Sequence, residues 1–276
     1  MLILLPPSEA KLAGGDGPSL SELGLASGGD VLGAARARVL AAVARMSRHD
    51  TARVRAALKL PAGSAAADLG ANVAVLDSPT MPALQRFSGV LFAALDVASL
   101  DRATRRRTAQ SVLVFSGAFG VLTAEEPLPL HRVPASATLP RIGGLATFWR
   151  KSLAAPMSER LEDAGLVVDL RSSDYAAMWV AADHERRSVV SVRVLERRDG
   201  ALRPVSWSAK RGKGLLAREL LRSDRARTPV RTAEDVCAAA ERIGYAVARI
   251  GYAVGRGGPS GPTRALDLVV PEITPQ

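Results

Sequence analysis

Three short apolar runs, each followed at once by a polar loop, constrain the fold of this chain most strongly. The runs are Leu2–Leu5, Val112–Phe115 and Leu166–Leu170. Their lengths and their partly β-branched content are typical of buried strands. Between the first two runs, Val31–Met46 carries a helical stripe of apolar residues. Strands that alternate with helices in this way predict an α/β fold.

The loops after these strands contain hydroxyl groups, charged groups and glycines. They hold Ser8, Glu9 and Lys11 after the first strand, Ser116, Gly117 and Gly120 after the second, and Ser172, Ser173 and Tyr175 after the third. Ligands of α/β sheets bind at the carboxyl ends of the strands. If the three strands are parallel neighbours, the loops converge on one pocket. A solvated turn is the alternative for the first loop, and a plain tight turn is the alternative for the second.

Three other segments are predicted from local pattern. Asn72–Leu76 is predicted to be a strand, and Pro82–Leu95 a helix with proline in its first turn. Leu145–Asp163 has helical content, but Pro156 removes one of its hydrogen bonds. We therefore expect that helix to end or kink near its middle.

A proline-rich stretch, Thr123–Leu139, is predicted to be a long loop and carries His131 and Arg132. Loops of this length inside a compact domain are often functional. His131 and Arg132 are therefore candidates for the same pocket.

The most basic part of the chain follows a predicted hairpin, in which Val189–Leu195 pairs with Ala201–Trp207 across an Asp-Gly turn. We call Ser206–Gly214 the basic motif, and a helix is expected from Leu215 to Arg222. The motif contains Lys210, Arg211 and Lys213, together with two glycines. Free N–H groups and the positive end of a helix dipole favour an anion at such a junction. The sequence therefore predicts an anion site there.

The overall charge points in the same direction. The 276 residues carry a formal net charge of +10, which predicts attraction to polyanions or to anionic small molecules. Aromatic residues make up only 4% of the chain, so surfaces that stack single-stranded bases are poorly supplied. The expected partner is therefore DNA or an anionic small molecule.

Other classes of site and location are disfavoured. Cys237, the single cysteine, cannot form an intramolecular disulfide, and none of the three histidines stands at metal-ligand spacing to another. We expect no metal and no cofactor. The first residues lack the features of a signal peptide, and no apolar run is long enough for a membrane span. A cytoplasmic protein without a membrane anchor is expected.

Several of these blocks together resemble the YaaA family, which is associated with resistance to peroxide stress. The resemblance rests on Leu4–Lys11, Arg86–Phe92, Ser116–Leu122, Asp169–Tyr175 and Ala209–Gly214, in family order. It implies one domain over residues 1–276, a mixed α+β architecture with a central mixed sheet flanked by helices, and a basic cleft. At least some members are thought to bind DNA and to limit damage from iron and peroxide.

The resemblance also implies which residues lie in or near the cleft. They are Ser8, Glu9, Lys11, Ser116, Gly117, Gly120, Arg132, Ser173, Tyr175, Lys210 and Lys213. This chain departs from the family pattern at Ala10, where a glycine is usual, and at His131, where a tyrosine is usual.

Two main functional hypotheses follow. In the first, the protein binds nucleic acid by neutralising phosphates, with Arg211, Arg218 and Arg222 as contacts. In the second, it is an enzyme acting on a small carboxylate or phosphate. The catalytic candidates are Ser8, Glu9, Lys11, His131 and Lys210, and the anion would be held by Arg132 and Lys213. A cleft that binds a regulatory ligand without chemistry is the third possibility. No serine nucleophile is expected, because no Ser-His-Asp pattern is visible.

Overall fold

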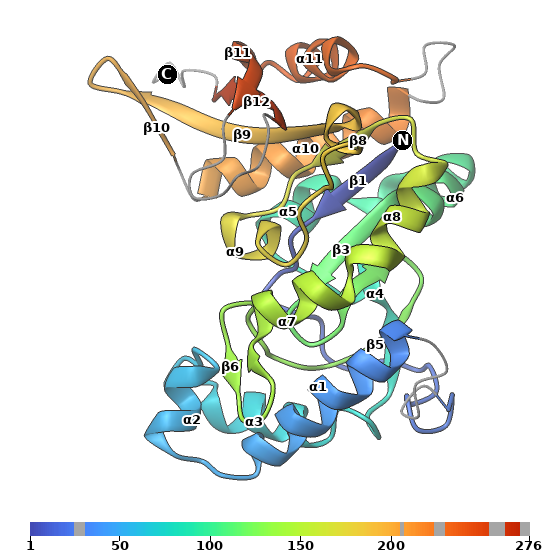
Figure 1. Cartoon of the computed structure of the whole chain (residues 1–276), viewed down its shortest axis with the longest axis vertical. Coiled ribbons are helices and arrows are strands. Elements are labelled where there is room, and N and C mark those ends of the chain that lie inside the picture. The colour runs from blue at the N-terminus through green and yellow to red at the C-terminus, as the bar shows by residue number, and fades with distance from the viewer. Residues whose placement is uncertain (25–30, 205–206, 224–229, 254–262, 271–276) are drawn as a thin grey trace.

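The computed structural model describes residues 1–24, 31–204, 207–223, 230–253 and 263–270, and Figure 1 shows how the elements are arranged. A central eight-stranded sheet has the order β11-β12-β9-β8-β1-β3-β4, with β10 paired to β9. The strands are β1 Leu2–Leu5, β3 Val112–Ser116, β4 Gly120–Thr123, β8 Val167–Asp169, β9 Val189–Arg198, β10 Ala201–Pro204, β11 Ala246–Ala253 and β12 Thr263–Val269. Parallel and antiparallel pairs both occur, and helices flank the sheet. The expected α/β fold with a mixed central sheet is confirmed.

The three apolar runs that organise the sequence lie next to one another as β8, β1 and β3. β1 is parallel to both neighbours, and Leu4 pairs with Leu113 on one side and with Asp169 on the other. Ile3, Leu4 and Leu5 are fully buried, as expected for a parallel strand covered on both faces. Because parallel strands end at the same edge, the three polar loops leave the sheet together.

The helices vary in length from one turn to several. They are α1 Val31–Ser47, α2 Ala52–Ala57, α3 Ala65–Val73, α4 Ala83–Arg86, α5 Val90–Leu95, α6 Arg102–Ser111, α7 Leu145–Ser152, α8 Ala154–Glu162, α9 Ser173–Ala176, α10 Trp207–Ser223 and α11 Ala233–Arg242, with 3-10 turns η2 Val97–Ser99 and η3 Arg186–Ser188. Two small sheets pair β2 Thr80–Pro82 with β5 Pro127–Pro129, and β6 Thr138–Leu139 with β7 Gly143–Gly144. Among the residues that the structure describes, no helix is long and apolar enough to cross a membrane.

Several local predictions are confirmed. The helix predicted over Leu145–Asp163 is broken at Leu153 into α7 and α8, and Pro156 lies in the first turn of α8. Proline is tolerated there because the first N–H groups of a helix have no partner within the helix. The expected hairpin is formed by β9 and β10.

Two local predictions are wrong. Asn72–Leu76 is not a strand, because α3 continues to Val73 and a turn follows. The side chain of Asn72 is buried and exchanges two hydrogen bonds with the backbone of Arg132, at 3.0 and 2.8 Å. The single helix predicted over Pro82–Leu95 is interrupted between α4 and α5, where Gly89 has a φ of 100°.

Candidate functional site

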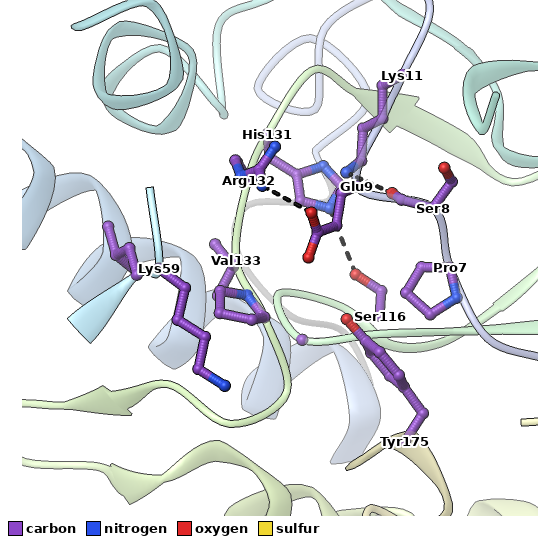
Figure 2. Close-up of a pocket in the computed structure, with 13 residues that line it drawn as sticks. Pro7, Ser8, Glu9, Lys11, Lys59, Ser116, His131, Arg132, Val133 and Tyr175 are labelled. Carbon is purple, nitrogen blue, oxygen red and sulfur yellow. Dashed lines mark hydrogen bonds and ion pairs between the residues drawn. The ribbon is translucent and has the colours of Figure 1, made fainter. Parts of the chain in front are cut away.

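A pocket lies at the edge of the sheet where β1 and β3 end, and we call it the Lys11 pocket (Figure 2). Its enclosed cavity volume is about 20 Å³, and the empty space amounts to about 370 Å³ when the part open to solvent is included. Its lining comes from the loops after β1, β3 and β5, the turn after α2, and α9: Pro7, Ser8, Glu9, Lys11, Leu58, Lys59, Ser116, Gly117, His131, Arg132, Val133, Pro134 and Tyr175. The structure therefore brings together residues from all three strand-end loops and from the proline-rich loop.

The loop after β1 is joined to the segment after α4. Lys11 forms an isolated β-bridge with Phe87, and the N–H of Ser88 donates to the carbonyl of Ala10 at 3.1 Å. The Nζ of Lys11 donates to the main-chain oxygen of Ser8 at 3.2 Å and lies 5.5 Å from the centroid of the Phe87 ring. The lysine is thus held by a neutral carbonyl and an aromatic face.

The buried side chain of Arg86 holds the loop after β1 in place. It is fully buried, and its guanidinium donates to the main-chain oxygens of Leu12, Gly14, Pro79 and Leu128 at 2.6 to 3.1 Å. These oxygens come from three separate segments, so one side chain ties them together. Sequence reasoning did not nominate Arg86, although it begins one of the blocks of the family resemblance.

The surroundings of Lys11 favour its uncharged form. Burial, and then the charge of Arg132, lower the pKa of Lys11 from 10.5 to about 7, and Arg86 contributes in the same direction. The carboxylates of Asp68 and Glu9 oppose the decrease without cancelling it. At neutral pH, a substantial fraction of this lysine is therefore free amine, which is a base and a nucleophile.

Ser116, the last residue of β3, faces His131. The Oγ of Ser116 lies 3.4 Å from Nε2 of His131, and Nδ1 of the same ring lies 3.0 Å from the carbonyl oxygen of Pro129. A carbonyl can only accept, so Nδ1 carries the hydrogen and Nε2 presents its lone pair to the serine. Burial and the charge of Lys11 lower the pKa of His131 well below its ordinary value. The imidazole is therefore neutral at physiological pH.

Arg132 extends along the rim of the pocket. Its Nη2 donates to Glu9 at 2.8 Å, its Nε lies 3.8 Å from Asp68, and Asn72 holds its backbone. Glu9 is 78% exposed, so this ion pair is weakened by solvent. Lys59, in the turn after α2, adds an exposed cation that sequence reasoning missed.

The third strand-end loop contributes one pocket residue. Tyr175 lines the pocket, and burial raises the pKa of its hydroxyl to about 12 despite a hydrogen bond with the backbone of Ala135. The hydroxyl therefore stays protonated at neutral pH. Ser172 and Ser173, at the start of α9, are exposed and do not line the pocket.

The two candidate glycines after β3 have different roles. A Cβ on Gly117 would lie 2.4 Å from the carbonyl oxygen of Val133, so only glycine lets these two pocket loops approach so closely. Gly120 has a φ of 75°, and a Cβ there would lie 2.7 Å from the ring of Trp149. Gly120 therefore allows the tight turn between β3 and β4 and its close packing against Trp149. It does not line the pocket.

The basic motif does not form a strand-to-helix junction around its lysines, because α10 already begins at Trp207. Residues 205–206 lie outside the described residues. A Cβ on Gly214 would be 2.2 Å from the carbonyl oxygen of Leu91 in α5, and one on Gly212 would be 2.8 Å from the hydroxyl of Tyr245. These glycines therefore allow close helix packing, and they lie within α10 and not at the predicted strand-to-helix junction.

Neither lysine of the motif lines the Lys11 pocket. Lys210 is exposed on α10. Lys213 points inward and donates to the carbonyl of Arg171 at 2.9 Å. Burial lowers the pKa of Lys213 to about 8, and the nearby charge of Asp169 opposes that decrease.

Lys213 belongs to a buried charged cluster beside the pocket. Arg171 donates to both oxygens of Asp169, at 2.9 and 2.7 Å, and its guanidinium lies 4.3 Å from the Phe115 ring and 5.2 Å from the Trp179 ring. The Asp169–Arg171 ion pair lies at the end of β8. It contacts β3 through the Phe115 ring and α10 through Lys213. Such a clamped arginine orients the segment that carries Tyr175.

The arginines nominated for nucleic acid differ in accessibility. Arg218 is used internally, because it donates to the main-chain oxygen of Asp96 at 2.7 Å and to Oγ of Ser99 at 2.6 Å. Arg211 and Arg222 are exposed on α10. A second basic surface lies on α6, where Arg102, Arg106 and Arg107 line a shallow hollow.

Comparison with known proteins identifies the family. The family model described as "Peroxide stress protein YaaA" matches residues 1–248. The chain belongs to the YaaA family. A UPF0246 protein of Streptomyces coelicolor is 39% identical over 224 residues, which cover 80% of this chain and 83% of that protein. A UPF0246 protein of Corynebacterium glutamicum is 34% identical over 247 residues, covering 88% of this chain and 93% of that protein.

Membership of the YaaA family confirms the resemblance inferred from the sequence blocks. Four of those blocks contribute directly to the Lys11 pocket or to the residues that hold it, from the Ser8 loop to Tyr175. The block in α10 contributes by packing against α5. Within the described residues, no group of three or more histidine, cysteine or acidic side chains is arranged to hold a metal ion.

Proposed function

We propose that this YaaA-family protein binds DNA, or another polyanion, with phosphate groups held at the Lys11 pocket. The observation that supports this proposal most directly is the charge of the lining. Lys59, Arg132 and the protonated fraction of Lys11 contribute cations to it, whereas Glu9 is the only carboxylate among the lining residues. The formal net charge of +10 on the whole chain acts in the same direction over longer distances.

The size of the pocket limits the mode of binding. An enclosed cavity of about 20 Å³ is too small for a duplex, so the backbone would run across the mouth and present one phosphate there. Contacts of this kind position DNA without reading its sequence. We therefore expect little sequence preference and a strong dependence on salt.

The test is fluorescence anisotropy with a labelled duplex over a salt series, comparing wild type with Lys59→Glu. Losing one phosphate contact should reduce the slope of log affinity against log salt by about 0.9. Arg231→Glu is the matched control, because Arg231 is exposed near α11 and makes the same change in charge. An equal loss in both variants, or no binding by wild type at low salt, would refute the proposal.

A second candidate function, catalysis on a small carboxylate or phosphate, is favoured by a separate observation. Lys11 has a pKa of about 7, and Ser116 lies 3.4 Å from the neutral imidazole of His131. A free amine beside a hydroxyl–imidazole pair can move protons, which simple phosphate binding does not require. A thermal-shift screen of acidic metabolites tests this candidate, because a ligand of the native state raises the melting temperature.

A further inference from the structure

The side chain of Lys11 has the surroundings that a nucleophilic amine needs. Figure 2 shows Lys11, His131 and Ser116 directed toward the same space, with Arg132 and Glu9 beside them. Nζ donates one hydrogen bond to a neutral carbonyl, that of Ser8, at 3.2 Å. Its contact with the Phe87 ring covers another side.

We propose that the amine of Lys11 forms an imine with a carbonyl compound that carries a carboxylate or phosphate close to its carbonyl carbon. This inference rests on the second candidate function of the same pocket and names its substrate class. The carbonyl would occupy the space between Lys11 and the Ser116–His131 pair. The anionic group would lie toward Arg132 and Lys59.

The amine is supported by the groups around it. Burial and the charge of Arg132 disfavour a charge on Lys11, and the carboxylates of Asp68 and Glu9 favour the charge without cancelling that effect. The hydrogen bond of Nζ goes to a neutral carbonyl and not to either carboxylate. Burial and the repulsion from Arg132 place the pKa of Lys11 at about 7. Lysines that attack carbonyl carbons are activated by the same two influences, desolvation and a neighbouring cation.

We expect the substrate to carry an anionic group because Arg132 and Lys59 line the pocket. Arg132 contacts Glu9 at 2.8 Å, but that carboxylate is 78% exposed and can be displaced into water. Lys59 supplies another charge from the turn after α2. A substrate carboxylate or phosphate at the rim would therefore be held while its carbonyl faces the amine.

The reaction balances without an oxidant or a reductant. The Nζ lone pair attacks the carbonyl carbon, so a C–N bond forms and the carbonyl π bond breaks. Nitrogen then loses a proton and the oxygen gains one, which gives a carbinolamine. Loss of the hydroxyl with a second proton releases water and leaves a C=N bond to Lys11. The lone pair on Nε2 of His131, reached through Ser116, can accept the proton from nitrogen and return it to oxygen.

Two sources could supply such a carbonyl, a free 2-oxo acid and the aldehyde of an abasic nucleotide in DNA, which is flanked by phosphates. The experiment treats the protein with sodium borohydride in the presence of glyoxylate or, separately, of a duplex with one abasic site. Borohydride reduces an imine to a stable amine, and peptide mapping of wild type locates the adduct. We expect the adduct on Lys11, so this localisation does not depend on any variant folding.

Two variants test whether trapping requires Lys11, and an uncharged aldehyde tests whether it requires an anionic group. Lys11→Arg should abolish trapping, whereas Lys213→Arg should retain it, because the buried Lys213 is outside the pocket. Acetaldehyde, which lacks the anion, should be trapped at least about tenfold less than glyoxylate, since a hydrogen bond to a charged group contributes about 1.5–3 kcal/mol. Adducts spread over exposed lysines, or unchanged trapping in Lys11→Arg, would overturn the inference.

Failure of the inference is distinguishable from failure of the candidate function. Glycolate has the carboxylate of glyoxylate but no carbonyl. If glycolate raises the melting temperature and neither probe is trapped on Lys11, the small-anion function stands and the imine is refuted. If glycolate has no effect and nothing is trapped, both are refuted.

Discussion

Replacing Lys11 with methionine is expected to stabilise the protein near neutral pH, by an amount that decreases as the pH rises. The pKa of Lys11 is lowered to about 7 in the folded protein from an ordinary value of 10.5. Between these values the unfolded chain binds more protons at this amine than the folded protein does. Wild-type stability at this site therefore increases as the pH rises through that window and decreases as the pH falls. Methionine has a similar length and removes the titration.

The magnitude follows from the same values. The gap between about 7 and 10.5 corresponds to about 5 kcal/mol at 1.36 kcal/mol per pKa unit. The substitution also removes the hydrogen bond to Ser8 and the contact with the Phe87 ring, worth about 1 kcal/mol each. We expect a net gain of about 3 kcal/mol near pH 6.5. Near pH 9 the charge contribution is only about 2 kcal/mol, and the lost contacts cancel it.

Urea unfolding of wild type and Lys11→Met at several pH values between these limits measures the difference in free energy. Subtracting wild type removes the titration of other groups, such as Lys213, from the comparison. Lys59→Met is the control, because it makes the same substitution at an exposed lysine of the pocket. A constant difference for Lys11→Met, or a loss of stability near pH 6.5, would show that the amine is not desolvated.

Two further substitutions test how the pocket is supported. Arg171→Leu should destabilise the fold by about 3–5 kcal/mol in urea unfolding, because it leaves a buried carboxylate without its partner. The exposed pair made by Arg55 serves as the control and should show no comparable loss. Gly214→Ala should destabilise by about 1–3 kcal/mol, since its Cβ would lie 2.2 Å from a carbonyl of α5. Gly70→Ala, in α3 with nothing within 4 Å of the added Cβ, should instead stabilise by about 0.5–1 kcal/mol, and equal effects at the two glycines would contradict the packing role.

Much of the fold could be predicted because it depends on short-range pattern. The three apolar runs became the adjacent parallel strands β8, β1 and β3, and their loops met at one edge as expected. Pro156 separated α7 from α8, because a missing N–H acts on its own helix. Asn72 was assigned wrongly, since its amide is recruited by the backbone of Arg132, a partner 60 residues away.

The sequence by itself determined the sheet edge, the loops that meet there and the family to which the chain belongs. It could not determine which lysine faces the pocket. Lys210 and Lys213 sit in the most basic stretch, but α10 packs on α5 through Gly214 and leaves one lysine exposed and the other buried elsewhere. The low pKa of Lys11 depends on burial and on the charges of Arg132 and Arg86. A pKa responds to distance and solvent access in three dimensions, so only the tertiary structure could decide it.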